Sequence, residues 1–311
     1  MNKMYLMVGV AGVGKSTYIS KHLLKDNSDL FSSDTYRKLL YGGLKEGNKH
    51  NNEVFNALHK DLKHYLETGD NKTAIYDATN LSRKRRRGVY EEFKGYAKVT
   101  IIFMYKPLEV IIRQNENRTG DANVPQDAIK RMYNNLQIPR VGVDCDEVIV
   151  DSKHYFKENY LQSNTVAELA DKVISPELAQ ELLENYTLHN SPYHKEDVNT
   201  HIELTIRNSI KSGLTEVALF HDLGKGLSKE FVSEDHARFI GHENIGAVYA
   251  FIALNAGRVV IDNDPIPEVI FHHMQANQNA LEKPTRLDKL TEQELYMLKS
   301  FSEIDKKSRL L

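Results

Sequence analysis

Residues 9–17 read Gly-Val-Ala-Gly-Val-Gly-Lys-Ser-Thr and directly follow the apolar run Met4–Val8. The spacing matches the G-x-x-x-x-G-K-[ST] loop, and the apolar run predicts the buried strand that normally precedes this loop. Its glycines allow backbone N–H groups to surround a polyphosphate, and the helix that starts after it contributes a positive dipole end. A glycine-rich turn alone would not explain the closing Lys-Ser-Thr. The sequence therefore predicts a nucleoside triphosphate site.

Side chains of this loop are expected to bind the nucleotide together with its backbone N–H groups. Lys15 is long enough to reach the β- and γ-phosphates, and the hydroxyl of Ser16 can bind Mg²⁺. The expected cofactor is ATP, or another nucleoside triphosphate, together with Mg²⁺. The loop residues expected to hold it are Gly9, Gly12, Gly14, Lys15, Ser16 and Thr17.

Length and charge point to two domains with different partners. The chain has 311 residues, enough for two domains that each bury a core. Residues 1–160 hold 26 of the 41 Lys and Arg but only 20 of the 43 Asp and Glu. An excess of basic charge around the phosphate loop fits a polyanionic substrate. The acidic remainder fits either a solvated surface or metal-binding carboxylates.

Composition also bears on the compartment. A single cysteine, Cys145, excludes an internal disulfide framework and is typical of a reducing environment, so a cytoplasmic protein is expected. The start of the chain lacks the apolar core of a secretory signal, and no apolar run approaches membrane-spanning length. No membrane partner is therefore expected, and the sequence leaves formation of a homo-oligomer open.

The first half of the chain alternates between strand and helix patterns. Strands are predicted at Tyr5–Val8, Leu30–Ser32, Thr73–Tyr76 and Val99–Tyr105. Helices are predicted between them, at Lys15–Leu24, Asn51–Leu66 and Ser82–Phe93. This alternation predicts a parallel sheet covered by helices. Ligands of such sheets bind at the carboxyl ends of the strands, so the residues just after each strand are candidates for the site.

Acids and arginines follow these predicted strands. Asp34 is placed to accept a proton from an attacking hydroxyl, and Asp77 could assist Mg²⁺ binding, although either acid could instead cap a helix. Arg113 and Arg118 fall on a predicted helix that ends at Thr119-Gly120. Arginines above the phosphates would stabilise the charge of a phosphoryl-transfer transition state. The alternative for both arginines is a solvated helix face.

Residues 1–140 resemble the polynucleotide 5′-kinase family. The resemblance rests on Gly9–Thr17, Asp34–Arg37, Ala78–Asn80, Asn115–Arg118 and Val124-Pro125. It implies that Asp34 is the general base for a 5′-hydroxyl, that Arg37 grips a nucleic-acid phosphate, and that Arg118 belongs to a lid over the nucleotide. Lys15 would act in the same reaction through the β- and γ-phosphates.

The match to that family is incomplete at the lid. The family's lid usually reads Arg-Asn-x-x-Arg, whereas here Gln114 precedes Asn115 and Arg118. Arg113, one position earlier, is the candidate substitute and is expected to contact the nucleotide. Because a helix turns about 100° per residue, a shift by one position changes the direction in which the side chain points.

Two further stretches of the first half have competing interpretations. The run Ser82–Arg87 is the densest positive charge in the chain and predicts contact with a nucleic-acid backbone, or else a solvated helix start. Asp144 and Asp146 form an Asp-x-Asp pair typical of some phosphatases, but the expected Gly-Thr is replaced by Glu147-Val148. Residues 141–175 are therefore interpreted as the end of the kinase domain and a connection.

Histidines and acids concentrate in the second half, which from Val166 onward reads as successive helices. Imidazole and carboxylate groups suit divalent Mn, Fe, Co, Ni or Zn. The side chains that could bind such an ion are His201, His221, Asp222, His242, His272, His273 and Asp305. Adjacent His and Asp side chains on a helix point in different directions, but both can bind one ion if a separate His and Asp complete the set. A lone buried histidine, by contrast, is more often part of a satisfied core.

Residues 175–311 resemble the HD phosphohydrolase superfamily through His221-Asp222-Leu223-Gly224-Lys225, an upstream His201 and a late Asp305. The resemblance implies that His201, His221, Asp222 and Asp305 bind one metal. Lys225 would neutralise the scissile phosphate. His242 and His273 match the ligands of a second metal, with His272 as the competing choice. His189 and His194 are left outside the ligand set.

Together these features predict an α/β P-loop kinase domain over residues 1–155, a linker over 156–174 and an all-α HD domain over 175–311. The expected function is the repair of RNA or DNA ends: phosphorylation of 5′-OH ends and removal of 3′-phosphate or 2′,3′-cyclic phosphate. A separate ligase would seal the ends. Two rivals remain: a nucleoside kinase fused to a nucleotide phosphohydrolase, and an HD protein regulated by a nucleoside triphosphate.

Overall fold

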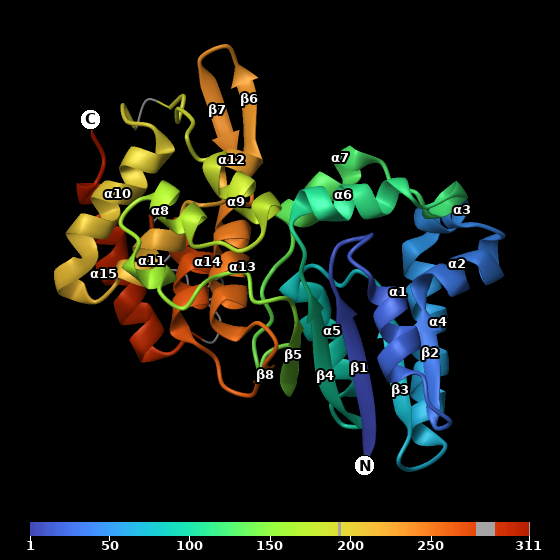
Figure 1. The fold of residues 1–311 in the computed structure, drawn as a ribbon. Helices are drawn as coiled ribbons and strands as arrows, with labels where there is room; N and C mark the ends of the chain where they lie inside the picture. Colours follow the sequence, from blue (N-terminus) through green and yellow to red (C-terminus); the bar gives the residue numbers. More distant parts are fainter. Residues whose placement is uncertain (192–193, 278–289, 311) are drawn as a thin grey trace. The chain divides into compact units, whose positions relative to one another are not determined.

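The computed structural model describes residues 1–191, 194–277 and 290–310, and they form two compact units (Figure 1). The first unit contains Met1–Tyr133, Pro139–Ser152 and Gly257–Asn263; the second contains Asn134–Ile138, Lys153–Ala256 and Asp264–Leu311. The chain therefore passes between the units several times. Only one connection between the two domains, a linker over residues 156–174, was expected from the sequence.

The first unit is built on a six-stranded sheet in the order β2-β3-β1-β4-β5-β8. The first five strands are parallel, and β8 is antiparallel to β5. The mostly parallel α/β fold expected from the sequence is thus confirmed. The strands are β1(Asn2–Val8), β2(Ser28–Ser32), β3(Thr73–Asp77), β4(Ala97–Met104), β5(Glu147–Asp151) and β8(Val259–Val260).

Strands β5 and β8 were not predicted. β5 is short, and β8 has two residues that pair with it through Val148↔Val260 and Ile149↔Val259. More than 100 residues separate these partners in the chain, so no local pattern reveals the pairing. Asp151 at the end of β5 was consequently not considered as a site residue.

Helices cover this sheet. Helix α4 shows the reason for their packing, because Val54, Leu58, Leu62 and Leu66 repeat every four residues and are buried. The predicted helix from Lys15 is α-helical only to Tyr18 and continues as a π-helical turn, η1(Ile19–Leu23). The helices are α1(Lys15–Tyr18), α2(Ser33–Tyr41), α3(Leu44–Gly47), α4(Asn51–Glu67), α5(Arg83–Phe93), α6(Leu108–Glu116) and α7(Gln126–Asn134); short 3₁₀ turns are η2(Asn48–His50) and η3(Gly120–Ala122).

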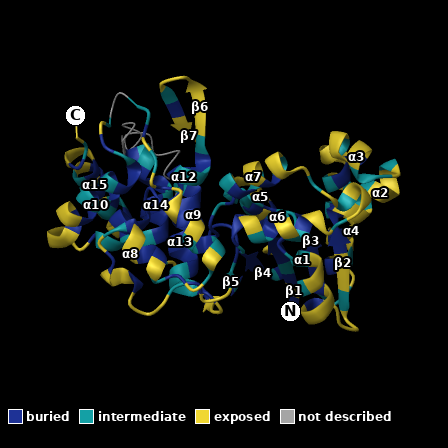
Figure 2. Cartoon of the chain, turned by 45° about the horizontal axis from the view of Figure 1, so that its top comes forward, coloured by how far each residue is buried: buried dark blue, intermediate teal, exposed yellow. Residues whose placement is uncertain are grey.

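The second unit is mainly helical. Helix α13 lies at its centre and is buried on most of its faces (Figure 2). The helices are α8(Val166–Asp171), α9(Pro176–Leu183), α10(Val198–Ser209), α11(Thr215–Phe220), α12(Lys225–Ser228), α13(His242–Asn255), α14(Pro265–Asn277) and α15(Glu292–Lys307), with 3₁₀ turns η4(Tyr160–Gln162) and η5(Ile210–Ser212). Within the described ranges, no helix has both the length and the apolar character needed to cross a membrane.

Two features of this unit differ from the expected all-α domain with a linker before it. The hairpin β6(Lys229–Ser233) and β7(His236–Phe239) projects from the helices beside α12. The expected linker is packed: Val166 and Leu169 of α8 are buried, and Phe156 pairs with Val173. Residues 156–174 therefore belong to the second unit and contribute some of its buried side chains.

Candidate active sites

The phosphate loop joins β1 to α1 at the carboxyl end of the sheet. Gly14 has φ +116 immediately before α1, a conformation that only glycine adopts without strain. Lys15 Nζ donates hydrogen bonds to the carbonyl oxygens of Gly9 (2.9 Å) and Val10 (3.1 Å). Burial lowers the pKa of Lys15 to about 8, although the nearby carboxylates of Asp77 and Asp34 act in the opposite direction.

A cavity of about 960 Å³ opens over this loop. Its lining brings together the phosphate loop, Asp34, Arg37 and Arg118, and Asp77 lies beside them. It is large enough for a nucleotide and part of an acceptor. Apart from Gly9 and Arg113, the residues that the sequence assigned to the first site line this single cavity.

Asp34 and Arg37 form a pair on the first two turns of α2. Arg37 Nη1 lies 2.8 Å from Asp34 Oδ1, and Arg37 Nη2 donates to Asn51 Oδ1 at 2.8 Å. Ser32, not Asp34, is at the N-cap of α2, so the capping alternative for Asp34 is wrong. It is wrong for Asp77 as well, because Asp77 ends β3 and accepts from Ser32 Oγ at 3.3 Å.

The lid residues depart from their expected positions. Helix α6 ends at Glu116, so Arg118 follows it rather than lying on it. Of the described residues near the lid, Gln114 lines the cavity and accepts from Lys106 Nζ at 3.1 Å, whereas Arg113 is outside the lining. The lining therefore gives no support to the expected substitution by Arg113, and it contains the cationic side chain of Lys106 instead. Lys106 follows β4, the position at which the sequence argument placed ligand-binding residues.

The arginines of the basic run Ser82–Arg87 have different surroundings. Arg86 is 0% exposed, its Nε lies 2.8 Å from Asp144 Oδ2, and its Nη1 donates to backbone carbonyls of Asn80 and Leu81. Its role is structural, since a buried cation needs such partners. Arg85, in contrast, lines the cavity and lies 3.7 Å from the ring centre of Phe55.

The Asp-x-Asp pair is also structural. Asp144 accepts from Arg86 and from the backbone N–H of Arg140 at 2.8 Å. Asp146 accepts from Tyr90 Oη at 2.8 Å and from Val99 N at 2.7 Å. These bonds fasten the segment before β5 to α5 and β4.

In the second unit, five helical regions bring together the ligand candidates. His201 comes from α10, His221 and Asp222 follow α11, His242 begins α13, His273 lies on α14 and Asp305 on α15. All six are buried. Five of them form two groups of potential metal ligands that share one carboxylate: His201, His221 and Asp222, and Asp222, His242 and His273.

Asp222 lies between these two groups. Its Oδ2 is 3.2 Å from His221 Nε2 and 3.7 Å from His201 Nε2. Its Oδ1 is 3.4 Å from His242 Nε2 and 3.7 Å from His273 Nε2. Burial favours the neutral acid, but His221 and Lys225 hold the pKa of Asp222 well below its usual range. Each oxygen of one ionised carboxylate thus faces a different set of imidazoles.

The histidine rings are oriented as metal ligands would be. His221, His242 and His273 each use Nδ1 to contact the carbonyl oxygen three residues earlier, at 2.8, 2.6 and 2.6 Å. A proton held on Nδ1 by such a bond makes the lone pair of Nε2 available to a metal ion. His221 Nε2 is buried and has no hydrogen-bond partner among the described residues. This donor set fits one or two divalent transition metals.

Several neighbours complete this cluster. His201 Nε2 lies 2.9 Å from Asp305 Oδ1, and Arg309 Nη2 lies 2.7 Å from Asp305 Oδ2. Lys225 Nζ lies 2.7 Å from Asp222 Oδ2. Gly224 is required by packing, because a Cβ there would come within 2.4 Å of the His242 carbonyl oxygen.

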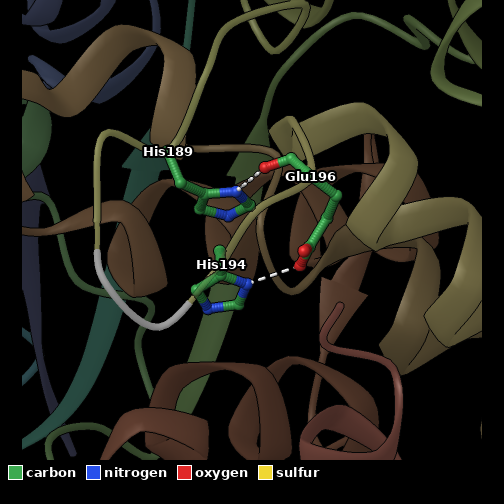
Figure 3. Close-up of side chains that lie close together, drawn as sticks. All are labelled: His189, His194 and Glu196. Atoms are coloured by element: carbon green, nitrogen blue, oxygen red, sulfur yellow. Dashed lines mark hydrogen bonds and ion pairs between the residues drawn. The ribbon is translucent and has the colours of Figure 1, made fainter. Parts of the chain in front are cut away.

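Sequence reasoning missed or set aside other residues of this site. His272 contacts Glu268 and Gln275, away from the cluster, so His273 rather than His272 joins it. His189, His194 and Glu196 form a third group of potential ligand atoms beside His201 (Figure 3). Glu196 and Arg309 carry no sequence signal, because each is an ordinary charged residue until the fold places it.

Comparisons with known proteins agree with the first site. A family model described as "AAA domain" matches residues 4–139. This match, the phosphate loop and the mostly parallel sheet agree with one another and with a P-loop fold for the first unit. None of the curated proteins matches the chain.

The similarities to three solved structures are weak. A chain of the Pnkp1/Rnl/Hen1 RNA repair complex is 22% identical with a TM-score of 0.40, covering 43% of this chain and 44% of that one. A second Pnkp1/Rnl/Hen1 structure is 21% identical, with a TM-score of 0.33 and coverages of 36% and 38%. A gluconokinase from Sinorhizobium meliloti 1021 is 16% identical, with a TM-score of 0.34 and coverages of 49% and 83%. This chain spans less than half the length of the first two chains.

Proposed function

We propose that the protein repairs nucleic-acid ends, with a 5′-hydroxyl kinase in the first unit and a metal-dependent HD-type phosphohydrolase in the second. The observation that carries the kinase half is the Asp34–Arg37 pair, which faces the same cavity as the phosphate loop. The phosphohydrolase half rests on Asp222, whose two oxygens face two sets of imidazole nitrogens.

In the kinase reaction, the 5′-oxygen of the acceptor forms a bond to the γ-phosphorus of ATP as the bond to the β-phosphate oxygen breaks. Asp34 accepts the proton of the 5′-hydroxyl, and Arg37 binds the adjacent phosphodiester. Lys15, Lys106 and Arg118 offset the negative charge that the transferring group develops. Ser16 would hold Mg²⁺, which would offset part of the negative charge of the phosphates.

In the hydrolytic reaction, metal ions held by His201, His221, Asp222, His242, His273 and Asp305 would supply an activated water and polarise the phosphate. The chain itself contributes the orientation of the rings through their Nδ1 bonds. Lys225 contributes a cation beside Asp222, within reach of a phosphate that enters the cluster. The six ligand side chains are buried, which strengthens these electrostatic interactions.

Both ends of a broken strand need treatment before sealing, and this favours nucleic acid as the common substrate. A break that leaves 5′-OH and 3′-phosphate or 2′,3′-cyclic phosphate needs a phosphate added at one end and removed or opened at the other. The basic excess of residues 1–160 supports a polyanionic acceptor. RNA is the preferred substrate in this proposal, because the cyclic phosphate requires a 2′-hydroxyl. A separate ligase would then join the ends.

The test uses RNA and DNA oligonucleotides labelled at either end, with ATP and Mg²⁺ or Mn²⁺, followed by analysis of the products. The expected result is γ-phosphate transfer to 5′-OH ends and loss or opening of the terminal phosphate at 3′ ends. Lys15→Ala should abolish only the transfer. Phosphorylation of free nucleosides without any transfer to oligonucleotides would instead establish a small-molecule kinase. Absence of turnover at both sites would indicate a regulatory protein.

A further inference from the structure

Residues 188–191 and 194–197 lie beside the His–Asp cluster and are joined to one another by hydrogen bonds. Leu188 and Asp197 pair, and His189 Nδ1 donates to the carbonyl oxygen of Glu196 at 2.8 Å (Figure 3). His189 is 1% exposed and Glu196 is 6% exposed. Two buried polar side chains of one loop are thus directed towards the cluster without belonging to the ligand set.

Glu196 contacts the first of the predicted ligands. Its Oε1 lies 3.3 Å from His201 Nδ1 and 2.6 Å from His194 Nδ1, and its Oε2 accepts from the backbone N–H of Leu310. The other ring nitrogen of His201 faces Asp305. A carboxylate on Nδ1 favours the tautomer that carries its proton there, so Nε2 is free to bind a metal.

His189 contacts Lys225 rather than a ligand. Lys225 Nζ lies 3.1 Å from His189 Nε2. An ammonium group can only donate, so His189 Nε2 accepts and the ring carries its proton on Nδ1, in agreement with its bond to Glu196. Burial and the charge of Lys225 lower the pKa of His189 to about 3, which keeps the ring neutral. The same ammonium group also contacts Asp222.

We infer that His189 and Glu196 are positioning residues of the second site: Glu196 orients His201 for metal binding, and His189 holds Lys225 beside Asp222. This inference rests on the proposed metal-dependent function. A third metal held by His189, His194 and Glu196 is disfavoured, because Lys225 and the Glu196 carbonyl already engage both nitrogens of His189. The rings of His189 and His194 also stack on each other, with their centres 4.1 Å apart.

The test of Glu196 measures Mn²⁺ affinity of the full-length protein by titration, with metal content after desalting as a second readout. Glu196→Ala should weaken binding about 10- to 100-fold, the usual effect of removing such a partner of a metal ligand. Glu196→Gln should restore much of it, because its amide oxygen can still accept from His201. Leu188→Ala, at an exposed position of the same loop, is the matched control. Parental affinity in Glu196→Ala, or equal losses in Ala and Gln, would overturn this role.

The test of His189 compares His189→Phe, which keeps an aromatic ring, with His189→Gln, which restores an acceptor near Nε2. His189→Phe should bind Mn²⁺ as the parent does but lower kcat about tenfold and weaken inorganic phosphate binding to the Mn²⁺-loaded protein by a similar factor. His189→Gln should recover most of both. Unchanged phosphate affinity in His189→Phe would contradict the role.

These readouts separate the inference from the proposed function. If the parent binds Mn²⁺ but hydrolyses no phosphoester, the proposed reaction fails while the Mn²⁺ and phosphate affinities still decide both positioning roles. If the parent binds no divalent metal, both the proposed site and the inference are wrong. A loss of exactly one ion of three in Glu196→Ala would replace the inference by a third metal site.

Discussion

The phosphate loop and the His–Asp cluster reach a functional arrangement by opposite routes. The loop is nine consecutive residues, and much of its chemistry lies in backbone N–H groups that any sequence with the right glycines presents. The cluster has six side chains spread from His201 to Asp305, and it exists only if α10, α11, α13, α14 and α15 pack correctly. A local motif can therefore be recognised without a fold, whereas a dispersed cluster depends on it.

The two sites also differ in what a substitution should affect. Residues of the first site line an open cavity, and Asp34 is exposed. Residues of the second are buried charges that compensate one another, so removing one leaves its partners unpaired. We expect substitutions in the first site to affect activity alone and those in the second to affect activity and stability together.

The largest effect is expected from Asp222→Ala. The variant should lose both metal positions and all measurable phosphohydrolysis, and the unpaired Lys225 and histidines should lower the free energy of unfolding by about 3–5 kcal/mol. Kinase activity at a temperature where the protein stays folded should be unchanged. Metal analysis, denaturant titration and both assays measure these outcomes, with Asp235→Ala on the exposed β6–β7 turn as the control. If the variant kept its metal content and its stability, Asp222 would not be the carboxylate shared by two metal positions.

Asp34→Asn should lower the kinase rate about 10²–10⁴-fold, because the variant keeps the shape of the side chain but loses the proton acceptor. ATP binding, the melting temperature and phosphohydrolysis should remain at parental values. Steady-state kinetics with a 5′-OH oligonucleotide provide the measurement. A variant with more than half of the parental rate would show that another group accepts the proton.

His242→Ala distinguishes one metal position from two. The parent loaded with Mn²⁺ and desalted should retain about two ions per chain, held about 3.5–4 Å apart if both act on one phosphate. The variant should retain about one fewer and lose most phosphohydrolysis. Equal metal content in parent and variant would assign His242 to packing or to substrate contact.

The lowered pKa of Lys15 predicts a pH dependence confined to the first site. ATP binding requires the protonated ammonium group, so affinity should be full below the pKa of about 8 and should fall as pH rises above it. At one pH unit above the pKa only about a tenth of the group is protonated, so the dissociation constant at pH 9 should be up to about tenfold larger than at pH 7. Lys15→Arg should bind ATP with little change over this interval, and calorimetry at several pH values tests both proteins.

The smallest effect is expected at the basic run, where adjacent arginines should differ. Arg85→Gln should raise the KM for an oligonucleotide a few-fold, because a phosphate contact is lost. The slope of the logarithm of oligonucleotide affinity against the logarithm of salt concentration should become shallower by about 1. Arg86→Gln should leave that slope unchanged and destabilise the fold, since Asp144 loses its buried partner. Kinetics at several salt concentrations and thermal denaturation separate the two. If both variants changed the salt dependence and the stability equally, the run Ser82–Arg87 would be one uniform surface.

Local patterns in the sequence were enough for the phosphate loop, for four of the six strands in the sheet of the first unit, and for the positions of Asp34 after β2 and Asp77 at the end of β3. Each of these follows from periodicity, glycine spacing or the rule that ligands bind at the carboxyl ends of parallel strands. The ligand candidates of the second unit came from a resemblance rather than from pattern, since six buried polar residues on separate helices share no period.

Tertiary structure alone decided the rest. It separated Arg86 from Arg85, although the two are neighbours in one run, because one side chain points into the unit's interior and the other to the cavity. It joined β8 to β5 across more than 100 residues and brought Glu196 beside His201. Burial and the pairing of distant side chains arise only when the helices and strands pack. The residue types along the chain therefore indicated the chemistry of both sites but could not predict their geometry.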